Sequence, residues 1–284
     1  MQKKIEHILA GRLKQITKEE SVLQPLPHID FRFANPFIVL HHMPPETIEA
    51  GSRARIHPHP HRGFAPVTFM LQGEGFHKDN AGHSEIVKAG DVQWMFAGRG
   101  LLHSEGPSDR ILEKGGTQEF VQLWINAPKA NKMDEPFYQT ASEKDQPKVL
   151  EQDGVNLRLA SGQYDGRQGP LRSFTPIISV IGEIQKGSRV FFPATPGYWT
   201  LLYIIKGKLC VNQESIEAHN LIVFEKDNDE IMVCAEDDTQ LLFLSAEPIE
   251  EPVAAKDNFV MNSAEEISQA MEDYKDGLFG TLSY

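Results

Sequence analysis

Residues 56–64, IHPHPHRGF, place three histidines at alternate positions: His57, His59 and His61. In an extended chain residues i and i+2 point to the same face, and each proline restricts the residue before it to extended geometry. Neighbouring imidazoles of this run then share one face, roughly 6.6 Å apart at Cα, and can converge on one metal at about 2.1 Å. The outer two histidines are about 13 Å apart and cannot both join it without a sharp bend. One His-x-His pair is therefore expected to bind.

A second pair of candidate ligands follows in GRGLLHSE, residues 98–105. His103 and Glu105 are again one residue apart, so they share a face if this segment is extended. Two such pairs on neighbouring strands would supply three imidazoles and one carboxylate. This mixed nitrogen and oxygen set suits Fe, Mn, Ni, Cu or Zn, and the sequence does not choose among them.

The frame around these pairs is rich in short apolar runs separated by turn residues, which favours an all-β sandwich or barrel. The runs are residues 36–40, 67–71, 92–96, 120–125, 177–181, 201–205, 221–224 and 241–244. In the third run, Trp94 and Phe96 share a face and are expected to pack in a core.

One helix is predicted, near the end of the chain. Ser263 to Glu266 has the S-x-x-E form of a capping box. Apolar residues then recur at helical spacing, and Gly277 can end the helix.

A weak internal repeat suggests a duplication. VTFMLQGE at residues 67–74 resembles LLYIIKGK at 201–208, and a polar stretch lies between them at 127–145. A chain of 284 residues also corresponds to about two domains. We therefore expect an N-terminal domain with the metal site at 1–132, a linker at 133–145, and a C-terminal domain without metal at 146–284 that includes the helix.

The charge balance excludes some classes of partner. Lys and Arg number 28 against 40 Asp and Glu, a formal net charge of −12. This argues against nucleic acids, whose phosphates need a basic patch, and against anionic membranes, but not against a basic protein partner.

Apolar content and cysteine usage favour a cytoplasmic location. No apolar stretch approaches the ~20 residues of a membrane span, and the N-terminus lacks the apolar region of a signal peptide. Cys210 and Cys234 form no disulfide framework, and each is expected to be a small buried residue. The reducing cytoplasm fits best.

Three segments resemble the pirin family of the cupin superfamily, and the resemblance covers most of the chain. They are HPHRGF at 59–64, GDVQWMFAGRGLLHSE at 90–105, and residues 251–280. The resemblance implies two tandem cupin β-barrels, with one divalent metal, usually iron, in the N-terminal barrel. Carried over by position, the family's ligands fall on His59, His61, His103 and Glu105.

The register of the first motif leaves an alternative open. Cupin spacing counted forward from Gly51 favours His57 and His59, whereas counting back from Gly73 favours His59 and His61. The pirin-like phrase agrees with the second register, which we adopt. This chain also has Ala65 and Pro66 where family members commonly carry a glutamate. Glu105 is then the acidic residue of the two motifs that is placed to reach the metal.

The resemblance implies quercetin 2,3-dioxygenase activity, in which Fe(II) and dioxygen open a flavonol ring and Glu105 serves as ligand, as base, or as both. The alternative is a non-enzymatic, iron-containing regulator whose redox state changes its affinity for a protein partner. Arg62 and Arg99 flank the ligand segments and could orient the ligands or lie at the rim. Four further histidines are expected to be ordinary surface or core residues: His41, His42, His77 and His83.

Overall fold

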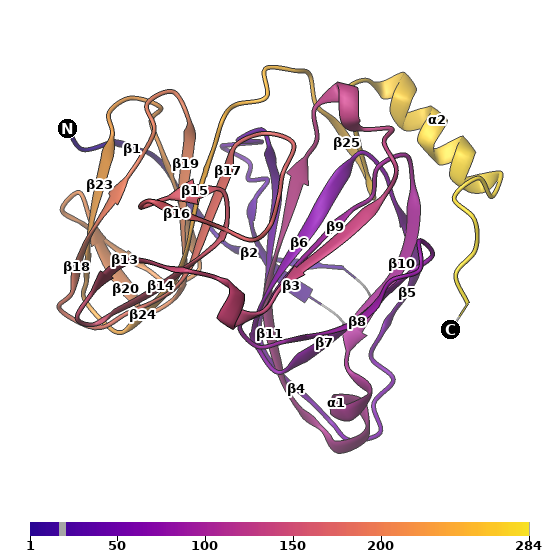
Figure 1. The fold of residues 1–284 in the computed structure, drawn as a ribbon, viewed down its shortest axis with the longest axis horizontal. Helices are drawn as coiled ribbons and strands as arrows, with labels where there is room; N and C mark the ends of the chain where they lie inside the picture. The colour runs from indigo at the N-terminus through magenta and orange to yellow at the C-terminus, as the bar shows by residue number, and fades with distance from the viewer. Residues whose placement is uncertain (17–20, 284) are drawn as a thin grey trace. The chain divides into compact units, whose positions relative to one another are not determined.

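The computed structural model describes residues 1–16 and 21–283, and most of its regular structure is antiparallel β-sheet (Figure 1). The chain divides into two compact units, each assembled from two segments. Unit 1 comprises Met1–His41 and Glu143–Pro248, and unit 2 comprises His42–Ser142 and Ile249–Tyr284. The predicted all-β class is confirmed.

Unit 2 holds the strands that carry the candidate ligands. Its elements are β4 (Phe37–Ile48, entering from unit 1), β5 (Ile56–His61), β6 (Phe64–Gln72), β7 (Glu74–Asp79), β8 (Ser84–Lys88), β9 (Val92–Phe96), β10 (Leu101–Pro107), α1 (Asp109–Lys114), β11 (Gly116–Asn126), a 3-10 turn (Lys129–Asn131), β12 (Phe137–Ala141), β25 (Ala254–Lys256), β26 (Phe259–Met261) and α2 (Ala264–Lys275).

Two antiparallel sheets form the body of unit 2. One has the order β5-β10-β7-β8, and in the other β12, β9, β6, β11 and β4 follow one another. β7 alternates partly and fully buried residues, as expected for a strand with one face on the core. β9 is buried on both faces. Trp94 and Phe96 are only 3% and 1% exposed, which confirms that they pack in the core.

Unit 1 repeats this plan. Its elements are β1 (Ile5–Ala10), β2 (Arg12–Gln15), β3 (Ser21–Leu26), a 3-10 turn (Glu143–Asp145), β13 (Lys148–Gln152), β14 (Val155–Ser161), β15 (Gln163–Tyr164), β16 (Arg167–Gln168), β17 (Ile177–Ile184), β18 (Arg189–Pro193), β19 (Trp199–Lys206), β20 (Lys208–Val211), β21 (Glu214–Glu217), β22 (Asn220–Phe224), β23 (Glu230–Ala235) and β24 (Thr239–Ala246).

The core of unit 1 lies between its two main sheets, whose orders are β1-β22-β19-β24-β17-β14-β13 and β18-β23-β20-β21. Leu159 and Phe243 from the first sheet and Phe192 and Val233 from the second belong to one buried apolar cluster. Burial of apolar side chains from both inner faces is what holds such a sandwich together.

Strand order supports the predicted duplication. In unit 2, β9, β6 and β11 are neighbours, and in unit 1 the corresponding neighbours are β22, β19 and β24. β6 and β19 are the two strands that carry the repeated sequence pattern. Each of the eight predicted apolar runs overlaps a strand, namely β4, β6, β9, β11, β17, β19, β22 or β24.

The compact units differ from the predicted contiguous ranges at both ends of the chain. β1 pairs with β22 of unit 1, and residues 249–283, here called the C-terminal segment, belong to unit 2. The expected linker is also partly structured, because β12 pairs with β9. Long-range strand pairing of this kind leaves no local pattern in the sequence.

The predicted C-terminal helix is present as α2, with Ser263 as its N-cap. The Ser263 hydroxyl accepts a hydrogen bond from the Glu266 backbone N–H, and the Glu266 carboxylate accepts one from the Ser263 backbone N–H. Gly277 follows the helix with a φ of 77°. Among the described residues, no helix is both long and apolar enough to cross a membrane.

Candidate metal centre

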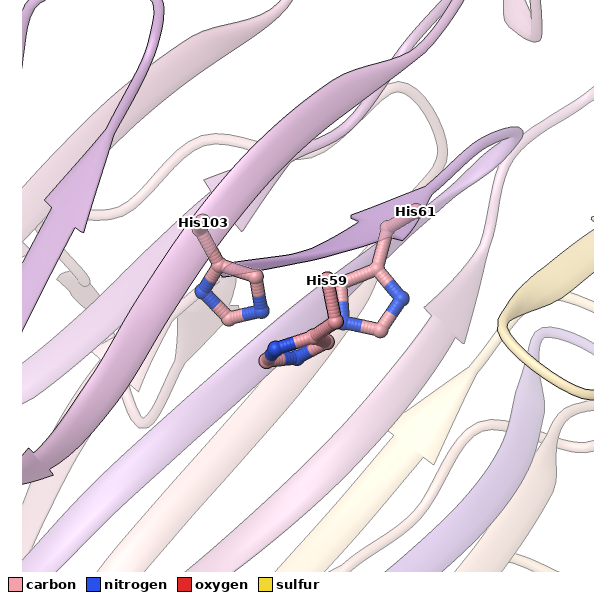
Figure 2. A group of neighbouring side chains, drawn as sticks. All are labelled: His59, His61 and His103. Atoms are coloured by element: carbon pink, nitrogen blue, oxygen red, sulfur yellow. The ribbon is translucent and has the colours of Figure 1, made fainter. Parts of the chain in front are cut away.

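Three histidines come together on two neighbouring strands (Figure 2). His59 and His61 lie on β5 and His103 on β10, and the two strands are antiparallel. His103 stands directly opposite His59, while Leu101 stands opposite His61. Since residues i and i+2 of a strand share a face, this pairing brings all three imidazoles to one place. We call His59, His61 and His103 the histidine cluster.

The geometry of the histidine cluster suits a metal ion. One ring nitrogen from each residue lies within 4.8 Å of the others. The ring centroids are 4.2 Å apart for His59 and His103, 4.8 Å for His61 and His103, and 4.9 Å for His59 and His61. Nitrogens that share a metal at about 2.1 Å lie no more than about 4.2 Å apart. Small side-chain movements would therefore suffice for coordination.

Backbone carbonyls fix the orientation of two of the rings. The Nδ1 of His59 lies 2.9 Å from the His57 carbonyl oxygen, and the Nδ1 of His61 lies 3.3 Å from that of Asn258. A carbonyl oxygen only accepts, so each Nδ1 must donate, and in the neutral ring Nε2 keeps its lone pair. Such a bond also orients metal-binding histidines in other proteins.

Burial favours the neutral form of the three histidines. It lowers the pKa of His59, with the His57 carbonyl opposing the shift. Burial and then the neighbouring His59 hold the pKa of His61 well below its ordinary value. The pKa of His103 is held well below its ordinary value in the same way, with His59, His61 and His77 adding to the effect of burial. Neutral imidazole is the form that binds a metal.

His103 gives the most direct indication of a metal-binding role. Its side chain is only 1% exposed, and neither ring nitrogen has a hydrogen-bond partner. Buried polar groups in folded proteins nearly always have one, so an exception calls for an unseen water or ion. The donor set and this orphaned pair of nitrogens both fit a divalent transition metal.

His57 lies outside the histidine cluster and is exposed. The register between β5 and β10 shifts between the His103–His59 pair and the Glu105–Ile56 pair. The shift places two residues of β5 opposite one of β10, which is a β-bulge. The bulge interrupts the alternation of faces, so the expectation that all three histidines of β5 share one face is wrong for His57.

Glu105 lies on β10 beside the histidine cluster but is not a member of it. Its Oε2 accepts a hydrogen bond of 3.0 Å from Gln122 Nε2, and Gln122 Oε1 in turn accepts one of 3.2 Å from the indole N–H of Trp124. Burial raises the pKa of Glu105, and His77 and Gln122 oppose the shift. Gln122 was not predicted as a site residue, although a glutamine inside the apolar run 120–125 is a sign of a buried polar role.

A second polar group adjoins the histidine cluster from β7. His77 is fully buried, its Nε2 donates to Asp79 at 3.1 Å, and its ring lies 5.5 Å from that of His103. His83 also bonds the Asp79 carboxylate, at 2.9 Å. Burial alone would raise the pKa of Asp79, but the hydrogen bonds of the two histidines outweigh it and lower that pKa. His77 was predicted to be a surface or a core residue, and it lies in the core.

The C-terminal segment holds the turn that follows His61. Arg62 donates to Asp273 at 2.6 Å, and its guanidinium lies 4.6 Å from the centre of the Phe279 ring. The backbone N–H of Val260 donates to the Arg62 carbonyl. Arg62 is 5% exposed and donates to the Arg99 carbonyl, whereas the Arg99 side chain is exposed at the rim.

The buried Lys132 links the turn after His61 to the C-terminal segment, although it directly precedes the expected linker at 133–145. It is 1% exposed, and its Nζ donates to the carbonyl oxygens of Gly63 and Val260, each at 2.8 Å, and to the Asn126 side chain. Nothing in the local sequence marked this lysine as buried.

Comparison with known proteins identifies the family. The family model described as Pirin matches residues 17–125, and that described as the Pirin C-terminal cupin domain matches residues 180–280. Pirin-1 of Arabidopsis thaliana is 36% identical over 284 residues, covering 97% of this chain and 94% of its own length. A pirin-like protein of Solanum lycopersicum is 38% identical over 227 residues, covering 78% of this chain and 76% of its own length.

A solved structure agrees over the full length. The crystal structure of a protein described as quercetin 2,3-dioxygenase from Acinetobacter baumannii matches with a TM-score of 0.93 and 33% identity, covering 100% of both chains. Both family models, the strand plan of the two units and these relatives lead to one conclusion: the chain is a two-cupin protein of the pirin family.

Proposed function

We propose that this protein is a metal-dependent dioxygenase that opens a flavonol such as quercetin at the 2,3-bond, with loss of carbon monoxide. His59, His61 and His103 would hold the metal, and Glu105 would be the fourth ligand, the catalytic base, or both in turn. The observation that carries the proposal is the buried His103, whose two ring nitrogens lack partners within reach of two oriented imidazoles. The relative from A. baumannii described as quercetin 2,3-dioxygenase supports the substrate class.

We take Fe(II) as the metal on the resemblance to the family, while Zn, Mn, Ni and Cu suit the same donor set. When bound, it would lower the pKa of a flavonol hydroxyl and supply the redox chemistry for dioxygen. The cytoplasm remains the location that we propose, on the cysteine content alone.

The protein's own residues would bind the flavonol and accept its proton. Glu105 is a carboxylate on the same strand as His103 and would take the proton of the flavonol hydroxyl. Gln122 donates a hydrogen bond to one oxygen of that carboxylate, and the Trp124 indole N–H donates one to Gln122. The rings of Phe64 and Trp124 lie 4.4 Å apart next to His61. Trp124 is partly exposed and would offer a ring on which a flat aromatic substrate packs, while the buried Phe64 supports that ring.

The test is quercetin consumption under oxygen by Fe(II)-loaded protein, with iron content measured in the same samples. His61→Ala should lose iron affinity at least about tenfold and lose turnover with it. Glu105→Gln should slow turnover by about a hundredfold or more, the usual contribution of a general base. His57→Ala is the matched control, because this histidine lies on the same strand outside the histidine cluster, and it should keep both iron and activity.

Two outcomes would count against the proposal. Loss of iron in His57→Ala but not in His61→Ala would favour the alternative ligand register. A wild-type protein that holds one iron and leaves quercetin intact would rule out quercetin as the substrate. The alternative hypothesis, an iron-containing regulator with a protein partner, would then be favoured.

A further inference from the structure

Cys210 and Cys234 face one another in unit 1, far from the residues of the histidine cluster in sequence and in a different unit. Cys210 lies on β20 and Cys234 on β23, and the pairing of these antiparallel strands places the two residues directly opposite each other. Both thiols are free. The two strands are labelled in Figure 1.

The two cysteines also lie on the same, outer face of their sheet. Their neighbours along each strand, Leu209 and Val233 among them, are fully buried, whereas both cysteines are partly exposed. The expectation that both would be small buried residues is therefore wrong. Successive residues of a strand alternate between faces, and these two occupy the face turned away from the core.

The backbone spacing already permits a disulfide. Directly opposed residues of antiparallel strands have Cα atoms about 4.5–5.5 Å apart, and disulfides span Cα distances of about 4.4–6.8 Å. The Cβ atoms of such pairs are about 4.5–5.5 Å apart, against about 3.5–4.5 Å in a disulfide. The bond would thus form with a small approach of the strands, and the strain of that approach would leave it easily reduced.

Both cysteines are partly exposed, so small reagents can reach them. Ser215 on β21 stands beside Cys210, and Arg189 on β18 stands beside Cys234. The Ser215 hydroxyl is engaged by Glu236, so it does not bridge to the cysteines. Arg189 beside Cys234 and Glu236 bonded to Ser215 beside Cys210 place charges of both signs next to the pair, so the charge of a reagent does not decide its approach. Glutathione disulfide is used as the probe because it is a small, water-soluble disulfide.

We propose that Cys210 and Cys234 form a reversible cross-strand disulfide by exchange with a low-molecular-weight disulfide. The thiolate of one cysteine attacks a sulfur of the reagent, forming a mixed disulfide and releasing one small thiol. The second cysteine, after losing its proton, attacks the protein sulfur of the mixed disulfide and releases the second small thiol. The protein loses two protons and two electrons, and these convert one reagent disulfide into two thiols.

In the test, the native protein is incubated with glutathione disulfide. The remaining free thiols are then alkylated, and the intact mass is measured. Wild type should lose both alkylatable thiols without gaining glutathione, and a thiol reductant should restore them. Cys210→Ser and Cys234→Ser should each stop at the mixed disulfide and carry one glutathione, because the resolving thiol is gone.

A displaced pair provides the matched control. Met232 lies on the same face of β23, so combining Cys234→Ser with Met232→Cys moves the thiol to a diagonal position, where residues are about 7–8 Å apart and their Cβ atoms somewhat less. This variant should form the internal bond less efficiently than wild type and accumulate mixed disulfides. Three results would overturn the proposal: two alkylatable thiols that persist in the native wild type, a disulfide-linked dimer, or an equally efficient bridge in the displaced variant.

Discussion

His103 carries two ring nitrogens into a nearly water-free position and gives neither a hydrogen-bond partner. A buried polar group left unsatisfied costs about 1–3 kcal/mol, so such an arrangement needs a compensating ligand. Its neighbours His59 and His61 behave differently, because a backbone carbonyl accepts a hydrogen bond from each Nδ1. At the scale of single residues, the site is prepared to bind a ligand at a cost in stability.

Lys132 allows a pH-dependent prediction at the same scale. Burial lowers its pKa to about 7 from 10.5, with Glu251 and Glu266 opposing the shift. Between these values the unfolded chain binds more protons than the folded one, so the contribution of Lys132 to the free energy of unfolding rises with pH. Below pH 7 both states are protonated, and this contribution stops changing.

The measurement is urea denaturation of wild type and Lys132→Met at pH 7 and pH 9. The difference in free energy of unfolding between the two proteins should change in favour of wild type by about 1–3 kcal/mol, since one unit of pKa corresponds to about 1.4 kcal/mol. All other groups titrate alike in both proteins, which isolates the lysine. An unchanged difference between the two pH values would contradict this prediction.

At the scale of single elements, local patterns predicted strands and the helix well. The strands were predictable from the apolar runs because the length and pattern of a run are local properties. The start of α2 was predictable because Ser263 and Glu266 form a capping box within four residues. The β-bulge at His57 was not predictable in this way, because it exists only in the pairing of β5 with β10. The role of Asn258 was not predictable either, since it orients His61 through its backbone carbonyl and not through its side chain.

Helix α2 permits a prediction with an internal control. Ser263→Ala removes the N-cap hydroxyl that accepts from the Glu266 N–H, which should lower the free energy of unfolding by about 1 kcal/mol. Ser268 lies on the exposed face in the interior of the same helix, and its hydroxyl donates to the Ala264 carbonyl one turn back. Ser268→Ala should be neutral or slightly stabilising, since alanine is the better helix former. Equal losses in both variants, measured by urea denaturation, would show that the cap contributes nothing specific.

At the scale of the whole molecule, the sequence predicted a duplicated two-domain chain but not how its ends are shared. β1 pairs with β22 in unit 1, and the C-terminal segment belongs to unit 2, where Asp273 bonds Arg62 next to His61 of the histidine cluster. A site assembled from β5, β10 and the C-terminal segment depends on contacts between residues about two hundred positions apart. Such contacts follow from the global fold, which no short motif encodes.

Metal removal should therefore loosen the region built around β5 and β10. A metal that binds only the folded state at a hundred times its dissociation constant stabilises it by about 2.7 kcal/mol, which would slow amide hydrogen exchange through local opening about a hundredfold. We expect anaerobic Fe(II) to protect peptides from β5 and β10, and a chelator to reverse the protection, with β20 and β23 as an internal reference that carries no proposed ligand. His103→Ala should abolish the protection and His57→Ala should retain it. Equal protection of both strand pairs would point to a non-specific effect of the ion, and protection that survives in His103→Ala would place the metal elsewhere in the chain.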